Sequence, residues 1–300
     1  MSTSPPFSTT TATLPPAAAD AFAERLPAPR RWTRPTPVTT PVPSAEATWT
    51  DLCERQHVSA EHLDLTDFDQ WTITYRPDRA TKLRVRAAHA VASHVLAGQP
   101  LLSGTWHRTA TARAGLHYLT SMDRLQSYAS WFERNTLMAL DFARPTTVAS
   151  QPFQLSWTSD GHTQKHIPDF AANIDGQVWV IDCRPAPRVD DKLLRDAAAT
   201  ARLCGLKGWR FALITGYRQP AHTTVTTLAS TRQAADPQGY AKRMLDRLAD
   251  GDAVWADLVN DCPAPAVARG VLQRLGWERA VSVDLSLHLD DDTVVSAGWV

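Results

Sequence analysis

Two aspartates in the middle of the chain fall on stretches that the sequence predicts to pair as a β-hairpin. Residues 166–174 and 177–184 alternate like strands, and the Asp-Gly pair at 175–176 is a strong signal for a two-residue turn. A two-residue loop at that point places Asp169 directly opposite Asp182. Opposed residues have Cβ atoms about 4.5–5.5 Å apart, and like charges at that distance destabilise the pair. The arrangement therefore requires a cation, or a proton on one of the two carboxylates.

A third acidic residue, Glu133, interrupts the apolar stripe of a predicted helix. Residues 121–142 have helical periodicity that stops before Pro145, and the face centred on Glu133 is otherwise apolar. A carboxylate on a face that packs against a sheet is costly unless it is paired or binds a metal ion. The simpler alternative is a glutamate at the rim of the stripe with its head group in water. Considered with the two opposed aspartates, the pattern favours a shared site for the three acids.

Three carboxylates beside a basic side chain could bind a divalent metal ion and act on a phosphodiester. Mg²⁺ prefers one or two protein carboxylates together with waters and phosphate oxygens, and Mn²⁺ accepts the same ligand types. Such an ion lowers the pKa of a bound water and neutralises charge on the phosphate. Arg184 lies two residues beyond Asp182 on the same strand face, where it could orient the water and hold the phosphate. We therefore predict a Mg²⁺ or Mn²⁺ site.

This ordered set of residues resembles the PD-(D/E)XK nuclease superfamily, and more closely the TnsA-like endonuclease subunits of heteromeric bacterial transposases. The resemblance rests on short motifs at 130–133, 140–142, 151–153, 166–170 and 180–185, and it extends more weakly over 190–209. It implies an α/β fold with a restriction-endonuclease-like core, a central mixed sheet flanked by helices. It also implies metal ligands at Glu133, Asp169 and Asp182, and a catalytic set that consists of those three residues and Arg184.

The resemblance further implies a metal-dependent DNA endonuclease that cuts DNA strands at transposon ends. Its expected partners are a TnsB-like transposase and a TnsC-like ATPase. The balance of 31 basic and 31 acidic residues suits a subunit that a partner brings to DNA, because such a chain exerts little long-range attraction on DNA. Two alternatives stay open. The chain could be a catalytically impaired nuclease-fold subunit for assembly or DNA-end binding, or it could be a stand-alone defence nuclease.

Arg184 departs from the superfamily pattern, which has a lysine at this position. Arginine stays protonated and binds phosphate through a bidentate fork, but it cannot act as a general base. Lys192, in the first turn of the next predicted helix, could reach the site and replace the missing lysine. The alternative is that Lys192 is a solvated helix residue. Gln151, at the start of the preceding strand, is the second accessory candidate.

Two further residues near the predicted site are expected to support it rather than to react. In a regular strand, His166 points away from Asp169, so we expect a packing or supporting residue and not a ligand. Cys183 lies on the face opposite Asp182 and is expected to be a core residue rather than a nucleophile.

Composition divides the chain into four segments. Residues 1–44 contain ten of the 21 prolines among many Ser, Thr and Ala residues, which predicts a disordered tail. Residues 45–118 form an accessory region, and 119–218 form the nuclease-like core, in which helix, strands, helix and strand follow one another. Residues 219–300 form a C-terminal helical module.

Basic residues outside the core are weaker candidates for DNA contact. The densest basic cluster of the chain consists of Arg76, Arg79, Lys82, Arg84 and Arg86. A solvated helix face is the alternative interpretation of this cluster. In the C-terminal module, three short helices and two β-like runs suggest a winged-helix arrangement whose recognition helix carries Arg269 and Arg274. A partner-docking or purely structural module fits that pattern equally well.

Composition also argues against several classes of protein. No run approaches the roughly 18 apolar residues of a membrane helix, so no membrane partner is expected, and the amino end lacks the features of a secretory signal. The four cysteines are far apart with no CxxC pair, which argues against zinc ribbons and disulfide frameworks and predicts a cytoplasmic protein with reduced thiols.

Overall fold

The computed structural model describes residues 41–58, 60, 67–101, 114–159 and 161–298. The predicted tail therefore lies almost entirely outside the described residues. No helix in the described part of the chain is both long and apolar enough to cross a membrane.

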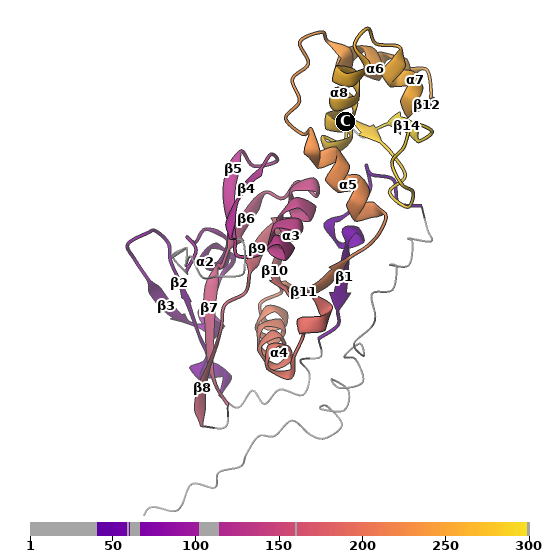
Figure 1. The fold of residues 1–300 in the computed structure, drawn as a ribbon. Helices are drawn as coiled ribbons and strands as arrows, with labels where there is room; N and C mark the ends of the chain where they lie inside the picture. Colours follow the sequence, from indigo (N-terminus) through magenta and orange to yellow (C-terminus); the bar gives the residue numbers. More distant parts are fainter. Residues whose placement is uncertain (1–40, 59, 61–66, 102–113, 160, 299–300) are drawn as a thin grey trace, which may run out of the picture.

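A mixed sheet of five strands forms the centre of the described chain (Figure 1). The strand order is β1-β11-β10-β9-β6, in which β10 and β11 are parallel and the other neighbours are antiparallel. The five strands are β1 (Cys53–Gln56), β6 (Thr147–Ser150), β9 (Phe170–Ile174), β10 (Gln177–Cys183) and β11 (Arg210–Tyr217). The expectation of a central mixed sheet in an α/β fold is confirmed.

Helices cover both faces of this sheet. Phe170 and Ile181 belong to the hydrophobic cluster that also contains the buried residues of α3 (Trp131–Phe142) and α5 (Ala221–Ser230). Val180, one position before Ile181, instead belongs to the cluster that contains the buried end of α4 (Asp191–Leu206). Since side chains alternate along a strand, the two helical layers lie on opposite faces.

The β9–β10 hairpin has the register that the sequence predicts. Gln177 pairs with Ile174, and the ladder continues to Ile181 opposite Phe170. Asp175 and Gly176 have φ angles of 50° and 77°, as a tight hairpin turn with two left-handed residues requires. Glycine adopts such an angle without strain, and aspartate tolerates it better than most residues.

The predicted single strand at 166–174 is wrong, because the chain forms two strands in different sheets. β8 (His162–His166) ends before Pro168, and β9 begins at Phe170. Proline has no N–H to donate to a ladder and restricts the residue before it, so the pairing breaks there. The chain thus passes from one sheet to the other at residues 167–169.

The second sheet is antiparallel and, in the described residues, has four strands in the order β3-β2-β7-β8. The other three strands are β2 (Thr72–Tyr75), β3 (Leu83–Arg86) and β7 (Phe153–Ser159). Its apolar face packs against α4 and the segment that follows β3. The accessory region therefore supplies strands to both sheets, since β1 pairs with β11 and β2 pairs with β7.

The predicted helix at 121–142 is half as long as expected. Strand β5 (Arg124–Tyr128), which pairs with β4 (Gly115–Leu119), occupies the first part together with the turn before it, and the helix α3 begins only at Trp131. Asp123 has a left-handed φ of 50°, which suits a turn, and the Ser130 hydroxyl accepts a hydrogen bond from the Glu133 N–H as the N-cap. Glu133 therefore lies in the first turn of α3 and not in the middle of a long apolar stripe.

The C-terminal module packs directly on the central layers. The Trp277 indole N–H donates to Thr120 Oγ1 at 2.8 Å, and the Trp277 and Phe142 ring centroids are 5.5 Å apart. Beyond α5, the predicted module contains α6 (Tyr240–Ala249), β12 (Ala253–Val254), α7 (Trp255–Asn260), α8 (Pro265–Trp277), β13 (Val281–Ser282) and β14 (Val294–Ala297). Short helical segments elsewhere are η1 (Trp49–Leu52), η2 (Phe68–Gln70), η3 (Ala87–His89), α2 (Ala92–Leu96) and η4 (Ala186–Arg188).

Candidate active site

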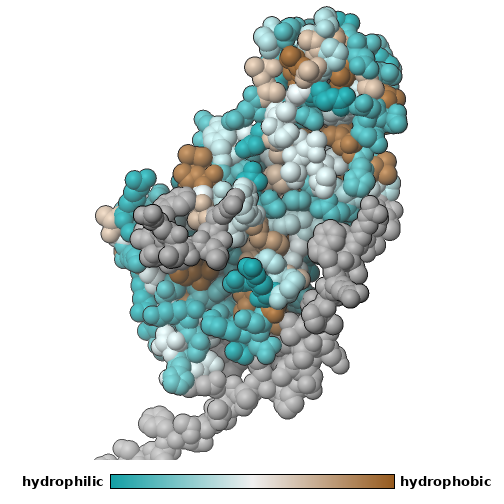
Figure 2. Space-filling model, in the orientation of Figure 1, coloured by the Kyte–Doolittle hydropathy of each residue, from teal (hydrophilic) through white to brown (hydrophobic). Residues whose placement is uncertain are grey.

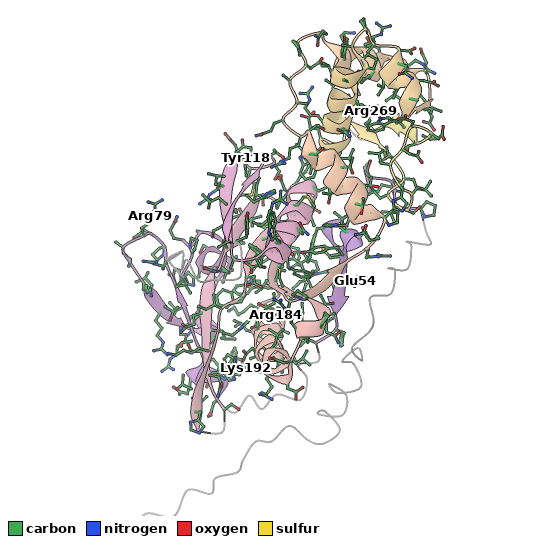
Figure 3. The ribbon with its side chains drawn as sticks, viewed as in Figure 1. Glu54, Arg79, Tyr118, Arg184, Lys192 and Arg269 are labelled. Atoms are coloured by element: carbon green, nitrogen blue, oxygen red, sulfur yellow. The ribbon has the colours of Figure 1, made fainter. Side chains whose placement is uncertain are left out.

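A cavity of about 380 Å³ is lined by the ends of β8 and β10, the residues between β8 and β9, and the start of α4. Arg184 follows β10 and Lys192 lies in the first turn of α4 (Figure 3). The charged residues at its wall include Lys165, His166, Asp169, Asp182, Arg184 and Lys192. The cavity thus contains two of the three predicted carboxylates and the predicted basic residue.

Asp169 occupies the crossing between the two sheets. Its Oδ2 accepts a hydrogen bond of 2.7 Å from the Cys183 N–H, across the end of the β9–β10 ladder. Burial raises the pKa of the Asp169 carboxyl well above its usual range, and the charges of Glu133 and Asp182 raise it further. The three predicted carboxylates therefore lie close enough for their charges to interact.

Glu133 uses both carboxylate oxygens at the start of its own helix. Oε2 accepts from the Ala129 N–H at 2.7 Å, and Oε1 accepts from the Ser130 hydroxyl at 2.9 Å. Burial raises the pKa of Glu133, while these two hydrogen bonds and the charge of Arg184 act against that rise. Ser130 and Glu133 have the spacing of a capping box. This signal is present in the sequence, and it predicts the helix start that the apolar periodicity missed.

Arg184 supplies positive charge beside Glu133 and Asp169. Its backbone N–H donates to Ile214 O at 2.9 Å, which extends the parallel pairing of β10 with β11 and fixes where the side chain starts. The side chain is exposed, and its charge acts to lower the pKa values of both Glu133 and Asp169. Arg184 therefore lies near enough to Glu133 and Asp169 for its charge to act on both carboxylates.

His166 has a closer relation to the site than its strand position suggests. Its Nε2 lies 3.0 Å and 2.9 Å from the two carboxylate oxygens of Asp182, and its Nδ1 lies 3.9 Å from Asp196 Oδ2. Burial alone lowers the pKa of His166, but Asp182 and Asp196 outweigh it, so the pKa lies above its ordinary value. The expectation that His166 points away from the site assumed a regular strand through 166–174, and the break before Asp169 removes that assumption.

The two accessory candidates have different surroundings. Lys192 lines the cavity, but its Nζ is 2.6 Å from Asp196 Oδ2 in an ion pair within α4. Its side chain is 68% exposed. Lys192 therefore lines the cavity and is at the same time a solvated residue of the helix. Gln151 is not among the residues that line the cavity. Its N–H donates to Asp169 O at 2.7 Å, and it thereby fixes the backbone that carries the carboxylate.

Cys183 is buried, as expected for a core residue. Burial raises the pKa of its thiol, and the nearby charge of Asp169 raises it further. A thiol that is held protonated in this way is a poor nucleophile.

The candidates for DNA contact lie outside the cavity. Arg269 pairs with Asp291 at 2.7 Å, and Arg274 lies 3.9 Å from Glu278, so both predicted recognition residues of α8 have acidic neighbours. The basic cluster does not lie on a helix face. Arg84 and Arg86 are on β3, and Arg76, Arg79 and Lys82 lie in the connection from β2 to β3.

The carboxylates suit a hard divalent ion by donor type, but they are not preorganised as ligands. Among the described residues, no group of three or more His, Cys, Asp or Glu side chains is arranged to hold a metal ion. Asp182 interacts with His166, and Glu133 caps α3. Mg²⁺ needs only one or two protein carboxylates. Asp169 and Glu133 are half-buried carboxylates with raised pKa values, and a cation between such groups would relieve their repulsion.

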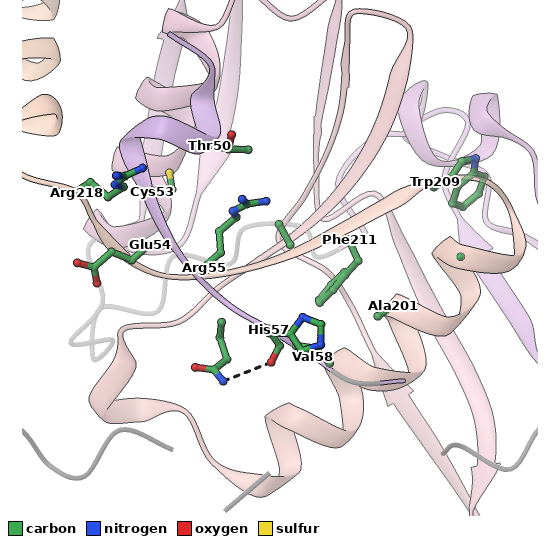
Figure 4. Close-up of a pocket in the computed structure, with 13 residues that line it drawn as sticks. Thr50, Cys53, Glu54, Arg55, His57, Val58, Ala201, Trp209, Phe211 and Arg218 are labelled. Atoms are coloured by element: carbon green, nitrogen blue, oxygen red, sulfur yellow. Dashed lines mark hydrogen bonds between the residues drawn. The ribbon is translucent and has the colours of Figure 1, made fainter. Parts of the chain in front are cut away.

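A second and larger cavity of about 940 Å³ lies beside the edge strand β1 (Figure 4). Glu54, Arg55, His57 and Arg218 contribute its charged and polar wall. It shares no lining residue with the smaller cavity and contains none of the predicted catalytic residues. The smaller cavity is therefore the candidate active site, although it is the less voluminous of the two.

No model of a known protein family matches the chain, and no curated protein sequence matches it. The assignment of a function consequently depends on the geometry of the smaller cavity and on the residues around it.

Proposed function

We propose that the chain is a metal-dependent DNA endonuclease subunit of the TnsA-like type, with a restriction-endonuclease-like core. The β9–β10 hairpin carries this proposal. Its ladder ends where Ile181 pairs with Phe170, next to Asp182 and Asp169, and both aspartates line the cavity with Arg184. The mixed sheet with helices on both faces supports it. In this assignment the protein acts at transposon ends with a TnsB-like transposase and a TnsC-like ATPase.

The predicted site residues have distinct parts in such a reaction. Asp169 and Glu133 would hold the Mg²⁺ or Mn²⁺ ion, with Asp182 beside them. When bound, the ion lowers the pKa of a water and neutralises charge on the phosphodiester. Arg184 would bind the scissile phosphate through its bidentate fork and stabilise the added negative charge. His166 would keep Asp182 in place.

The element order of the C-terminal module supports a winged-helix arrangement. One helix, a short strand, two helices and two further strands follow one another, and β14 pairs with both β12 and β13. The ion pairs of Arg269 and Arg274 leave α8 with little free positive charge. We therefore assign the module to contact with a protein partner rather than to sequence-specific DNA reading.

A second candidate is a catalytically impaired subunit that assembles the complex or binds DNA ends. Two observations favour it: Glu133 is engaged in capping α3, and an arginine occupies the position of the usual lysine. An Arg184→Lys variant separates the candidates, because it restores the group that the superfamily uses. Nicking by this variant but not by the wild type would support the second candidate.

The main test is an assay for nicking of DNA that carries the transposon ends. It uses the full chain, the transposase encoded by the neighbouring gene, and a series of Mg²⁺ or Mn²⁺ concentrations. We expect metal-dependent nicks with the wild type, none with Asp169→Ala, and unchanged nicking with the exposed control Asp252→Ala. Equal nicking by the wild type and Asp169→Ala would refute the catalytic assignment. A circular dichroism spectrum of each variant checks that the fold is intact.

A further inference from the structure

The four-stranded sheet has one apolar face and one polar face. Ile73 and Leu155 lie opposite one another on adjacent strands and belong to the hydrophobic cluster beneath the sheet. Because side chains alternate along a strand, the flanking positions lie on the other face. Strand pairing arranges them in two cross-strand rows, Arg86–Thr72–Ser156–Lys165 and Arg84–Thr74–Gln154. We call these seven residues the cationic face.

The strands of this face carry positive charge and, as described, no acidic residue. Arg84, Arg86 and Lys165 are all exposed. None of the strands β2, β3, β7 and β8, as described, contains an Asp or Glu residue. At the hairpin end, Asp78 accepts hydrogen bonds from the Ala80 and Thr81 N–H groups, so its carboxylate is committed to the turn.

Neutral polar residues hold the cations on the sheet. Arg84 Nε donates to Thr72 Oγ1 at 2.9 Å, and Arg86 Nη1 donates to Gln70 Oε1 at 2.8 Å. Both acceptors are neutral, so these hydrogen bonds do not offset the positive charge of Arg84 or Arg86. Each guanidinium also has further N–H donors that these bonds do not use. Arg86 and Lys165 end the longer row on β3 and β8, which are three strand spacings apart, about 14 Å.

The cationic face reaches the candidate active site. Gln154 and Lys165 belong to this face and also line the 380 Å³ cavity with Asp169 and Arg184. At its far end, the β2–β3 connection adds Arg79 and Lys82, and Arg79 lies at the outer tip of the molecule (Figure 3). Figure 2 shows mainly hydrophilic residues over the lower end of this sheet.

We propose that the cationic face binds the sugar–phosphate backbone of duplex DNA and directs it into the cavity that contains Asp169. This inference rests on the proposed endonuclease function. Exposed Arg and Lys side chains are the groups that contact DNA phosphates, and such contacts position a duplex without reading its sequence. The positive charge of the described strands β2, β3, β7 and β8, which contain no Asp or Glu, is complementary to a polyanion.

The test is equilibrium binding of the full chain to a fluorescent duplex of arbitrary sequence, in EDTA, over a series of salt concentrations. The triple variant Arg84→Gln/Arg86→Gln/Lys165→Gln removes three charges from the face. If each cation neutralises one phosphate, the slope of log K against log salt becomes shallower by about 2.7, and affinity at low salt falls by tenfold or more. The matched control removes three exposed charges elsewhere, Arg124→Gln/Arg195→Gln/Arg210→Gln, and keeps the wild-type slope.

Three results would overturn the inference: a wild type that does not bind the duplex, equal slopes for the two triple variants, or tighter binding of duplex RNA than of duplex DNA. Circular dichroism confirms that each variant is folded. Because binding is measured without a divalent ion, these results do not depend on cleavage. A failure of this binding test would contradict the role of the cationic face. The proposed endonuclease function is tested separately, by metal-dependent nicking.

Discussion

The imidazole of His166 lines the candidate active site, and its Nε2 lies 3.0 and 2.9 Å from the two carboxylate oxygens of Asp182. Asp182 is only 2% exposed. A buried carboxylate without a partner is strongly unfavourable, so this pair fixes where the Asp182 oxygens lie relative to Asp169. The relation makes His166 a positioning residue for the site and gives it a measurable effect on stability.

Replacement of His166 by alanine should destabilise the protein by about 3 kcal/mol, because it leaves a buried charge unpaired. The pKa of His166 is raised above its ordinary 6.5. The stability that its protonated form contributes is therefore fully present below pH 6.5 and is lost as the pH rises through the folded-state pKa. Urea unfolding at pH 6 and pH 9 should show a larger loss at pH 6. The exposed His162, on the same strand, gives the control His162→Ala, and an equal loss at both pH values would contradict the prediction.

Asp169→Asn should stabilise the metal-free protein at neutral pH. The asparagine oxygen can still accept from the Cys183 N–H, while the repulsion from Glu133 and Asp182 is removed. The pKa of Asp169 is raised in the folded state. The stability that its protonated carboxyl contributes is therefore fully present below its ordinary pKa of 3.8, and it is lost as the pH rises through the folded-state pKa. We expect the Tm of Asp169→Asn to exceed that of the wild type by about 2–4 °C at pH 8, equivalent to ~1 kcal/mol. This difference in Tm should become smaller toward pH 5.

Calorimetry of both proteins in EDTA measures this difference. Asp252→Asn makes the same change of charge at an exposed position and should leave Tm within about 1 °C of the wild type, since surface substitutions have small effects. A lower Tm for Asp169→Asn than for the wild type at pH 8 would show that the Asp169 carboxylate is stabilising, contrary to the expected repulsion.

Mg²⁺ or Mn²⁺ should stabilise the wild type by binding to the folded state. At an ion concentration ten times Kd, the gain is about 1.4 kcal/mol, readable as a rise in Tm that does not depend on DNA or on activity. Asp169→Asn and Glu133→Gln should abolish the rise. Glu54→Gln, which changes a carboxylate in the other cavity, should retain it. A rise that persists in Asp169→Asn would remove Asp169 from the set of metal ligands.

Local signals in the sequence predicted the parts of the site that depend on neighbouring residues. The Asp-Gly turn sets the β9–β10 register, and Asp190 caps α4 at Leu193 N close to the predicted start. The helix α4 continues through Gly205 to Leu206, and the left-handed glycine after it is Gly208. Pro168 is a competing local signal, and the strand breaks there into β8 and β9.

Contacts between distant segments could not be predicted in this way. Strand β1 contains Glu54 and Arg55 among only four residues, and its place at the edge of the central sheet comes from pairing with β11 far along the chain. The pairing of His166 with Asp182 likewise joins two sheets, and it depends on the direction in which the chain leaves β8. Periodicity describes a single element, whereas these relations follow from how the elements pack.

Trp277→Ala should destabilise the whole protein by about 3–5 kcal/mol, as expected for a buried tryptophan. Trp277 is 4% exposed, and its contacts with Phe142 and Thr120 join the C-terminal module to the central layers in a single hydrophobic cluster. We therefore expect urea unfolding of the variant to remain one transition at a lower midpoint. Trp131, which is 50% exposed, provides the control, and Trp131→Ala should cost less than about 1 kcal/mol. Two transitions, with only one of them shifted by Trp277→Ala, would instead show that the C-terminal module unfolds independently of the sheet that carries Asp169.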